Sequence, residues 1–250
     1  MTIPSVETLG YFLQEHAQNM KTLGMIGGVG PESTIDYYKN LIVMYRERKP
    51  DGHYPQFVIN SIDLQTGIDF LDADNLDGMA GFLLREIDVL AKAGADFGII
   101  AANTPHIVFD DLAPKLPIPF ISIVNAASTY AKTRGLKRLA LLGTRYTMQA
   151  GFYQRVFRND GIELITPEPA DQDYIHEKYF AELVPGIFLP ETHDKFMAIV
   201  DRMKSDHGIE GVTLAGTELA LILREESHNG IAFLDTGKIH CQAAVEEMLG

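Results

Sequence analysis

The chain has 250 residues, with 21 lysine and arginine residues against 34 aspartate and glutamate residues, and a formal net charge of −13 at pH 7. The basic residues are scattered, which argues against nucleic acid as a partner, because a phosphate backbone is bound by clustered positive charge. Cys241 is the only cysteine, so an intramolecular disulfide and a cysteine-rich zinc site are excluded, and a reducing, cytoplasmic location is expected. No apolar run reaches the roughly 18 residues of a membrane span, so no membrane contact is expected.

The first 20 residues are mostly polar, with Leu9, Phe12 and Leu13 spaced as on one face of a helix. They lack a basic stretch followed by an apolar core, which argues against a secretion signal. We expect an N-terminal extension over residues 1–20.

From residue 21 onward, short apolar runs alternate with amphipathic segments. The apolar runs predict strands at residues 21–26, 56–62, 97–101, 119–123, 138–142, 162–165, 211–214 and 231–235. The segments between them predict helices at residues 31–48, 75–93, 126–134, 147–159, 171–183, 192–204, 218–226 and 237–249. This alternation predicts an α/β fold with parallel sheets and helices on both faces.

Two parts of the chain are built alike. Residues 21–27 and 136–143 both run from an apolar strand into a glycine turn and a helix, about 116 residues apart. The strand ends at Ala102 and Gly216 are about 114 residues apart. We therefore expect two similar α/β domains, at 21–132 and 133–250, with a cleft between them at the carboxyl ends of the strands. The alternative left open by this division is that the C-terminal elements pack back on the first domain.

A glycine-rich turn follows the first strand. Glycine lets the backbone turn tightly, and free amides at the start of the next helix can face an anion, so Gly28 and Gly30 are candidate carboxylate-binding positions. The turn differs from a dinucleotide-binding loop, because the third glycine is absent and Pro31 removes an amide donor. A tight turn with Ser33 or Thr34 near the helix cap is the alternative interpretation.

The loop after the strand at 97–101 carries candidate polar groups. Asn103 offers donors and an acceptor, Thr104 offers a hydroxyl, and His106 titrates near neutrality. Each also has an ordinary interpretation, since Asn-Thr before proline is typical of a turn and a lone histidine is often a hydrogen-bonded structural residue.

Two later strands end in similar loops. Thr217 and Glu218 suit either a site or a helix start, because threonine caps helices and glutamate favours the positive end of the helix dipole. His240 follows the last strand and supports the cleft or forms a local cap. Cys241 lies in a helical stretch and is expected to be a packed thiol rather than a nucleophile.

None of the eight histidines stands at a recognisable metal-ligand spacing, so no metal is expected. The loops also lack nucleotide-binding signatures, so we expect no cofactor.

Five segments in order resemble the aspartate/glutamate racemase family: residues 24–34, 103–106, 142–148, 216–219 and 235–240. The resemblance covers the chain from about residue 21 to its end. It implies two α/β domains with pseudo-twofold symmetry, a substrate cleft between them, no pyridoxal phosphate and often a homodimer. The expected carboxylate-binding groups all fall at predicted strand ends, where neutral donors can hold an anion without a buried lysine. They are Gly28, Gly30, Asn103, Thr104, Thr144 and Thr217.

The resemblance breaks where this family normally carries its two catalytic cysteines. Ala102 and Gly216 stand at these positions. Racemisation needs a base on one face of the α-carbon and an acid on the other, and a thiol with a pKa near 8.5 can act as either. A methyl group and a hydrogen cannot. If the two positions face each other, cysteines placed at both are expected to flank a substrate.

Three functions remain open. The first is a racemase-like isomerase of a small acidic amino acid such as aspartate or glutamate, with Thr104, His106, Thr217 or Glu218 transferring protons. The second is a lyase or another reaction on a small dicarboxylate. The third is a non-catalytic protein that binds small carboxylates.

Overall fold

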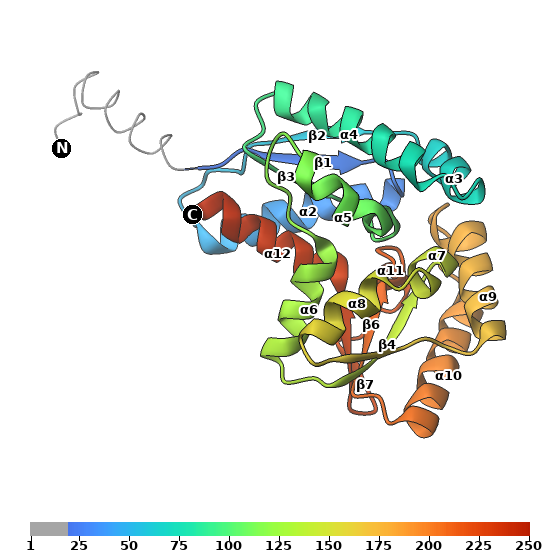
Figure 1. Cartoon of the computed structure of the whole chain (residues 1–250). Coiled ribbons are helices and arrows are strands. Elements are labelled where there is room, and N and C mark those ends of the chain that lie inside the picture. Colours follow the sequence, from blue (N-terminus) through green and yellow to red (C-terminus); the bar gives the residue numbers. More distant parts are fainter. Residues whose placement is uncertain (1–19) are drawn as a thin grey trace, which may run out of the picture.

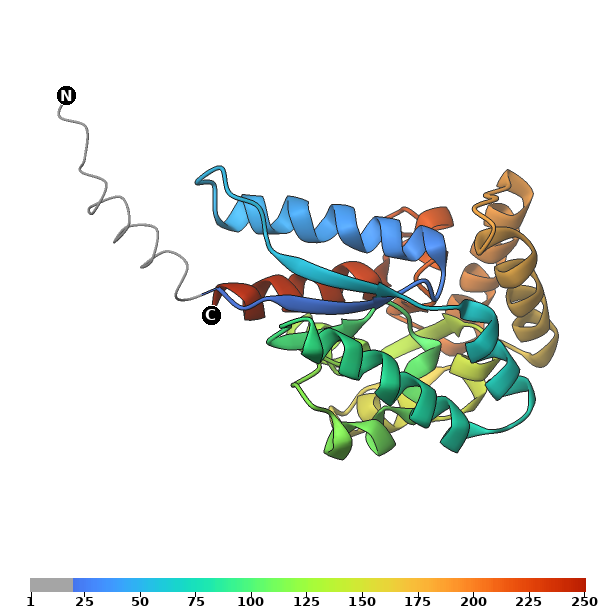
Figure 2. The same ribbon diagram turned by 90° about the horizontal axis from the view of Figure 1, so that it is seen from above.

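The computed structural model describes residues 20–250, so all but the last residue of the extension predicted at residues 1–20 lies outside the described residues. Two sheets are each flanked by helices (Figures 1 and 2). The first has the order β2-β1-β3 and consists of β1 (Leu23–Gly27), β2 (Phe57–Ser61) and β3 (Phe97–Ile100). The second has the order β5-β4-β6-β8-β7 and consists of β4 (Arg138–Gly143), β5 (Glu163–Ile165), β6 (Gly211–Ala215), β7 (Ser227–His228) and β8 (Ile231–Asp235).

Every strand pair is parallel except β7 with β8. The α/β fold with two parallel-dominated halves is therefore confirmed. The longer helices are α2 (Pro31–Arg48), α3 (Leu64–Asp72), α4 (Leu76–Lys92), α6 (Ile123–Thr133), α8 (Phe152–Asn159), α9 (Pro169–Lys178), α10 (Pro190–His207) and α12 (Thr236–Leu249). Shorter turns are η1 (Thr104–Val108), α5 (Phe109–Leu112), η2 (Ala113–Lys115), α7 (Arg145–Gln149), the π-helical η3 (Tyr179–Leu183) and α11 (Leu219–Ile222).

Local chemistry explains where the elements depart from expectation. Gly151, at φ 78°, divides the predicted helix at 147–159 into α7 and α8. The helix predicted at 218–226 ends at Ile222. The following residues instead form strand β7, and the chain then turns at Asn229 and Gly230, both with positive φ, into β8. The predicted strand at 119–123 is reduced to a bridge between Gly98 and Phe120.

Helix α3 was not expected. Asp63 begins it, and its carboxylate accepts hydrogen bonds from the backbone N–H groups of Gln65 and Thr66, each at 3.2 Å. Such a cap offsets the unpaired amides of a first helical turn. Because α3 follows the carboxyl end of β2, it adds a wall to the edge of the sheet where loops gather.

Alternate residues of each strand enter different cores. Leu23 and Met25 pack on one face of the first sheet with residues of α2 and α12, whereas Ile26 packs on the other face with residues of α4. Helix α12 thus covers the first sheet, and α6 packs on the second, with Ala127 and Ala131 in the same cluster as Leu139 and Leu141. Helix α6 contains residue 132 and packs on the second sheet, while α12 belongs to the second predicted domain and packs on the first sheet. The division at residue 132 stays a prediction.

Helix α2 faces the core with residues spaced four apart. Tyr37, Leu41 and Tyr45 are buried, as their helical spacing predicts. Tyr38 is 48% exposed, because it lies one residue, or about 100°, around the helix from Tyr37.

We expect Leu41→Ala to lower the free energy of unfolding by about 2–5 kcal/mol, because it removes buried methyl groups between α2 and α12 and leaves a cavity. Val43→Ala, at a position 54% exposed on the same helix, is the control and is expected to change it by less than about 0.5 kcal/mol. Urea unfolding followed by circular dichroism measures both. Equal losses would contradict the packing of α2 described above.

Candidate functional site

Three loops meet at the carboxyl ends of the strands. They follow β1, β3 and β6, and residues from each line one cavity of about 50 Å³. The predicted site residues in its wall are Gly30, Asn103, Thr104, Thr144 and Glu218, with Ala102 beside them. The site therefore draws on both halves of the chain. A larger hollow of about 600 Å³ lies beside β8 and the start of α12, and none of the predicted site residues lines it.

Glu218 is the most deeply buried ionisable group of this cavity, at 1% exposure. Ser33 donates a hydrogen bond to its Oε1 at 2.6 Å, and Thr217 donates one to its Oε2 at 3.0 Å. Ser33 belongs to α2 and also lies 2.5 Å from the Thr217 hydroxyl. A carboxylate from the second half is thus held by a helix of the first.

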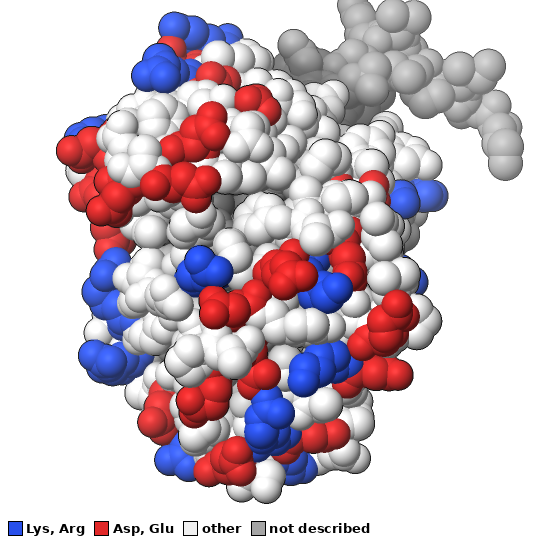
Figure 3. Space-filling view, turned by 90° about the vertical axis from the view of Figure 1, so that its right-hand side faces the viewer, with Lys and Arg blue, Asp and Glu red and all other residues white. Residues whose placement is uncertain are grey.

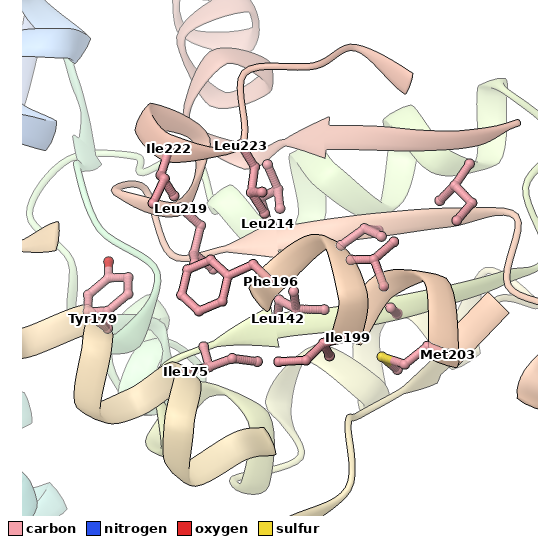
Figure 4. Close-up of a cluster of buried hydrophobic side chains, with 14 of the residues drawn as sticks. Leu142, Ile175, Tyr179, Phe196, Ile199, Met203, Leu214, Leu219, Ile222 and Leu223 are labelled. Carbon is pink, nitrogen blue, oxygen red and sulfur yellow. The ribbon is translucent and has the colours of Figure 1, made fainter. Parts of the chain in front are cut away.

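Tyr179 completes the ring of hydroxyls around Glu218, because its phenol donates to Oε2. Burial, and then the nearby Glu218 carboxylate, raise the pKa of Tyr179 well above its usual range. The phenol is therefore a proton donor at neutral pH. Figure 4 shows Tyr179 at one end of the core of the second half, with its hydroxyl directed away from the other labelled side chains.

The ring of Tyr179 fills the place that a side chain at residue 216 would take. A Cβ added to Gly216 would lie 2.6 Å from Cε2 of Tyr179. The φ angle of Gly216 itself is not in the left-handed region. Glycine is therefore required here by close approach and not by backbone conformation. Cysteines at residues 102 and 216 were expected to flank a substrate. Because the ring of Tyr179 occupies the space at residue 216, they can do so only if Tyr179 moves.

A π-helical turn brings Tyr179 to this place. Tyr179 is its first residue, and its carbonyl accepts from the N–H of Val184 at 2.9 Å. The extra residue in such a turn redirects the side chains that follow an α-helix, and π turns often accompany functional sites. The sequence predicts one continuous helix here, so this change of direction was not foreseen.

Three threonine hydroxyls meet on the other side of the cavity. The Thr104 hydroxyl lies 3.1 Å from those of Thr144 and Thr147, which are 3.2 Å from each other. Thr144 also caps α7, since its hydroxyl accepts from the N–H of Thr147. Thr104 and Thr144, predicted from separate segments, are therefore neighbours.

Asn103 is tied to the second half through its amide. Its oxygen accepts from Tyr153 at 2.5 Å, and its nitrogen donates to Thr236 at 3.2 Å. Thr236 in turn donates to the carbonyl of Leu214 on β6. These bonds hold the loop in place, and the second N–H of the Asn103 amide is the donor that its predicted role in carboxylate binding requires.

The two central histidines form hydrogen bonds to the backbone. His106 Nε2 accepts from the N–H of Ile123 at 3.3 Å, so Nδ1 carries the proton and donates to the carbonyl of Ala102 at 3.0 Å. Burial lowers the pKa of His106 to about 3 and that of His240 to about 4. His240 lies 3.0 Å from the Tyr37 hydroxyl and 2.9 Å from the carbonyl of Ile121. This geometry disfavours His106 as a proton carrier.

Other predicted residues lie behind the cavity wall. The N–H of Gly28 donates to Thr34 at 2.9 Å, so its amide is already bonded. Thr217 supports Glu218 but is absent from the lining. Cys241 is fully buried against the first sheet, and burial raises its pKa well above the usual range, so the packed-thiol interpretation is confirmed.

Charge in the cavity is one-sided. Its lining contains Glu218 but no lysine, arginine or histidine. Within residues 20–250, no ion pair involves Glu218. Over the same residues, no group of three or more histidine, cysteine or acidic side chains is arranged to hold a metal, and no helix is long and apolar enough to cross a membrane.

Sequence reasoning missed Tyr179 and the apolar wall contributed by α3. The signal for Tyr179 was Gly216 itself, because a glycine at a buried strand end indicates close approach by another group. Ser33 was assigned only to the helix cap, although it forms hydrogen bonds to Thr217 and Glu218, which lie 184 and 185 positions further along the chain.

Two α/β halves with a cavity at their strand ends, lined by acid, hydroxyl and amide groups from both halves, are the architecture that the resemblance to amino-acid racemases implies. A family model described as Asp/Glu/hydantoin racemase matches residues 26–244. The chain belongs to this family.

Solved structures agree with this assignment. An aspartate racemase homologue from Pyrococcus horikoshii is 33% identical, with a TM-score of 0.76 over 91% of this chain and 98% of the other. An aspartate racemase from Picrophilus torridus is 21% identical, with a TM-score of 0.75 over 92% and 96% of the two chains, which shows the fold. The broad specificity amino-acid racemase RacX of Bacillus subtilis is 27% identical over 57% of this chain, and the match spans 63% of RacX.

Close packing of Tyr179 on Gly216 predicts an energetic coupling between the two residues. We expect Gly216→Ala to cost about 1–3 kcal/mol of unfolding free energy in the wild type, because the added methyl group overpacks the site. The cost is expected to vanish in a Tyr179→Ala background. Gly81→Ala on α4, whose Cβ would lie 3.8 Å from its nearest neighbour, is the control. A cost that persists without Tyr179 would refute the coupling.

The buried histidines predict a stability that falls in acid. Their folded pKa values of about 3 and about 4 lie below the ordinary 6.5, so below pH 6.5 the unfolded chain takes up protons that the folded chain does not. Each histidine then lowers the unfolding free energy by about 1.4 kcal/mol per pH unit, down to its folded pKa. Urea midpoints between about pH 7 and pH 5 measure the slope. His106→Gln is expected to reduce that slope; an unchanged slope would contradict the assignment.

Proposed function

We propose that this protein is a cofactor-independent isomerase that moves the α-proton of a small amino acid. The observation that carries the proposal is the shared cavity, which is lined by Thr104 of the first half and by Tyr179 and Glu218 of the second. Racemisation needs proton-transfer groups on two sides of the α-carbon. The family to which the chain belongs supports the same reaction.

On the second side, Tyr179 and Glu218 stand in for the missing thiol of residue 216. A proton removed from the α-carbon passes to the phenol oxygen while the phenol proton passes to the Glu218 carboxylate. When both transfers run in reverse, Glu218 returns its proton to the phenol oxygen while the phenol gives a proton to the α-carbon on that face. The hydrogen bond from Tyr179 to Glu218 supports this relay, because both groups line the cavity.

On the first side of the α-carbon, Ala102 supplies no proton. Thr104, two residues further along the same loop, is a predicted proton-transfer group that lines the cavity. Its hydroxyl contacts two other hydroxyls, and an alcohol needs such partners to act in proton transfer. We assign Thr104 this role. The predicted contributions of His106 and Thr217 are then indirect, through the position of the loops.

A second candidate function is a one-sided reaction, such as a lyase step on a small carboxylate. The absence of a thiol or other acid at Ala102 favours it, because a lyase needs fewer proton-transfer groups than a racemase. The class of substrate also stays open. The predicted acidic amino acid has the precedent of relatives named aspartate racemase, while the relative RacX is named for broad specificity. The homodimer and the cytoplasmic location remain predictions.

We expect wild-type protein without added cofactor or metal to exchange the α-proton of an amino acid in D₂O, as followed by proton NMR. Chiral chromatography of the same samples separates inversion, expected for an isomerase, from exchange with retention. Glu218→Gln is expected to slow exchange about 10²-fold or more, because the relay loses its acceptor. Ser128→Ala, outside the cavity, is the control. New products without exchange would favour the lyase, and binding without turnover would refute an enzymatic role.

A further inference from the structure

The cavity has a polar end and a long apolar wall. Glu218, Tyr179 and the Thr104 hydroxyl form the polar end. The apolar wall comes from the turn after β1, from α3 and α4, and from the π turn and the residue after it: Val29, Leu64, Ile68, Leu71, Met79, Phe180 and Val184. A bound amino acid that presents its reacting carbon to Tyr179 therefore directs its side chain towards hydrocarbon.

An acidic side chain has no partner in this wall. A carboxylate removed from water needs a cation or several hydrogen bonds, and the lining carries no lysine, arginine or histidine. The one acidic side chain already in the lining is Glu218, which forms no ion pair among the described residues. A dicarboxylic amino acid would bring a second and third negative charge beside it.

The mouth of the cavity carries charges of both signs. Tyr146 lines the cavity and donates to Asp72, at the end of α3. Its neighbour Arg145 pairs with Asp173, and the ring of His176 lies 5.6 Å from that of Tyr146. Figure 3 shows acidic side chains on the upper left of the molecule and basic side chains below them. The selectivity of the site therefore depends on the lining of the cavity and not on the charge of its mouth.

We propose that the substrate is an amino acid with a small apolar side chain, such as alanine or valine, and not aspartate or glutamate. Its ammonium group faces Glu218, which supplies the opposite charge, and its α-carboxylate, which every amino acid carries, lies against the hydroxyl of Thr144 at the polar end. Its side chain lies against α3 and Val184, where a second carboxylate would find no such hydroxyl. A cavity of about 50 Å³ holds on the order of four water molecules, which suits a short side chain. The inference rests on the proposed function, since it names the substrate of the same site.

Val184 offers a way to reverse this selectivity. It is partly buried, follows the π turn directly and lines the cavity, so Val184→Lys places a cation in the apolar wall. Ile187 is 45% exposed, three residues further on, and is absent from the lining. Ile187→Lys therefore makes the same change of charge outside the cavity and is a matched control.

The experiment measures α-proton exchange in D₂O and thermal shift for wild type and both variants with alanine, valine, aspartate and glutamate. For wild type, kcat/KM for alanine or valine is expected to exceed that for aspartate by at least about ten-fold, the scale of discrimination by an apolar pocket. Val184→Lys is expected to narrow or invert this ratio. Ile187→Lys is expected to leave it unchanged.

Each result decides between the two proposals. Faster exchange of aspartate or glutamate by wild type would overturn the apolar substrate and leave the isomerase intact. Thermal stabilisation by alanine or valine alone, without exchange, would uphold the binding preference and overturn the isomerase. No response to any of the four amino acids would overturn both. Because the wild-type panel decides these outcomes, a poorly folded Val184→Lys does not weaken the test.

Discussion

The buried carboxylate of Glu218 is the group on which the geometry of this site depends. It receives hydrogen bonds from Ser33 of the first half and from Thr217 and Tyr179 of the second. A carboxylate without a counter-ion is costly to bury, so each hydroxyl that reaches it is held firmly. The consequence is that one side chain fixes the start of α2, the loop after β6 and the turn after α9 relative to one another.

The same cluster explains why a glycine at residue 216 leaves no void. Protein interiors are packed to the density of organic crystals, so space that one residue does not fill is taken by another. Here the ring of Tyr179 takes it, and its hydroxyl reaches Glu218. A phenol next to a carboxylate therefore lies beside Gly216. At Ala102 only a methyl group lines the cavity, and the two faces of the cavity are chemically unequal.

The sequence was sufficient for the fold because its signals are local and repeated. Apolar strands such as 138–142 and the buried face of α2 follow directly from residue spacing, and strand-end loops in parallel sheets converge wherever the sheets exist. It was insufficient for Tyr179, since a π turn differs from an α-helix by one residue and leaves no mark in hydrophobic spacing. It was also insufficient for His106, because only the fold shows that Ala102 and Ile123 bond to both ring nitrogens.

Family membership and the proposed substrate preference depend on different parts of this molecule. The fold, the glycine turn and the Thr217-Glu218 loop make the chain a racemase relative, and they would serve any amino acid equally well. In the proposal above, selectivity depends on the surface that faces the substrate's side chain, which is built from α3, α4 and Val184. A wall of hydrocarbon distinguishes charged from uncharged side chains strongly, because an unpaired charge loses its hydration there and gains nothing in return. The proposal therefore separates the groups that move the α-proton from the groups that choose the amino acid.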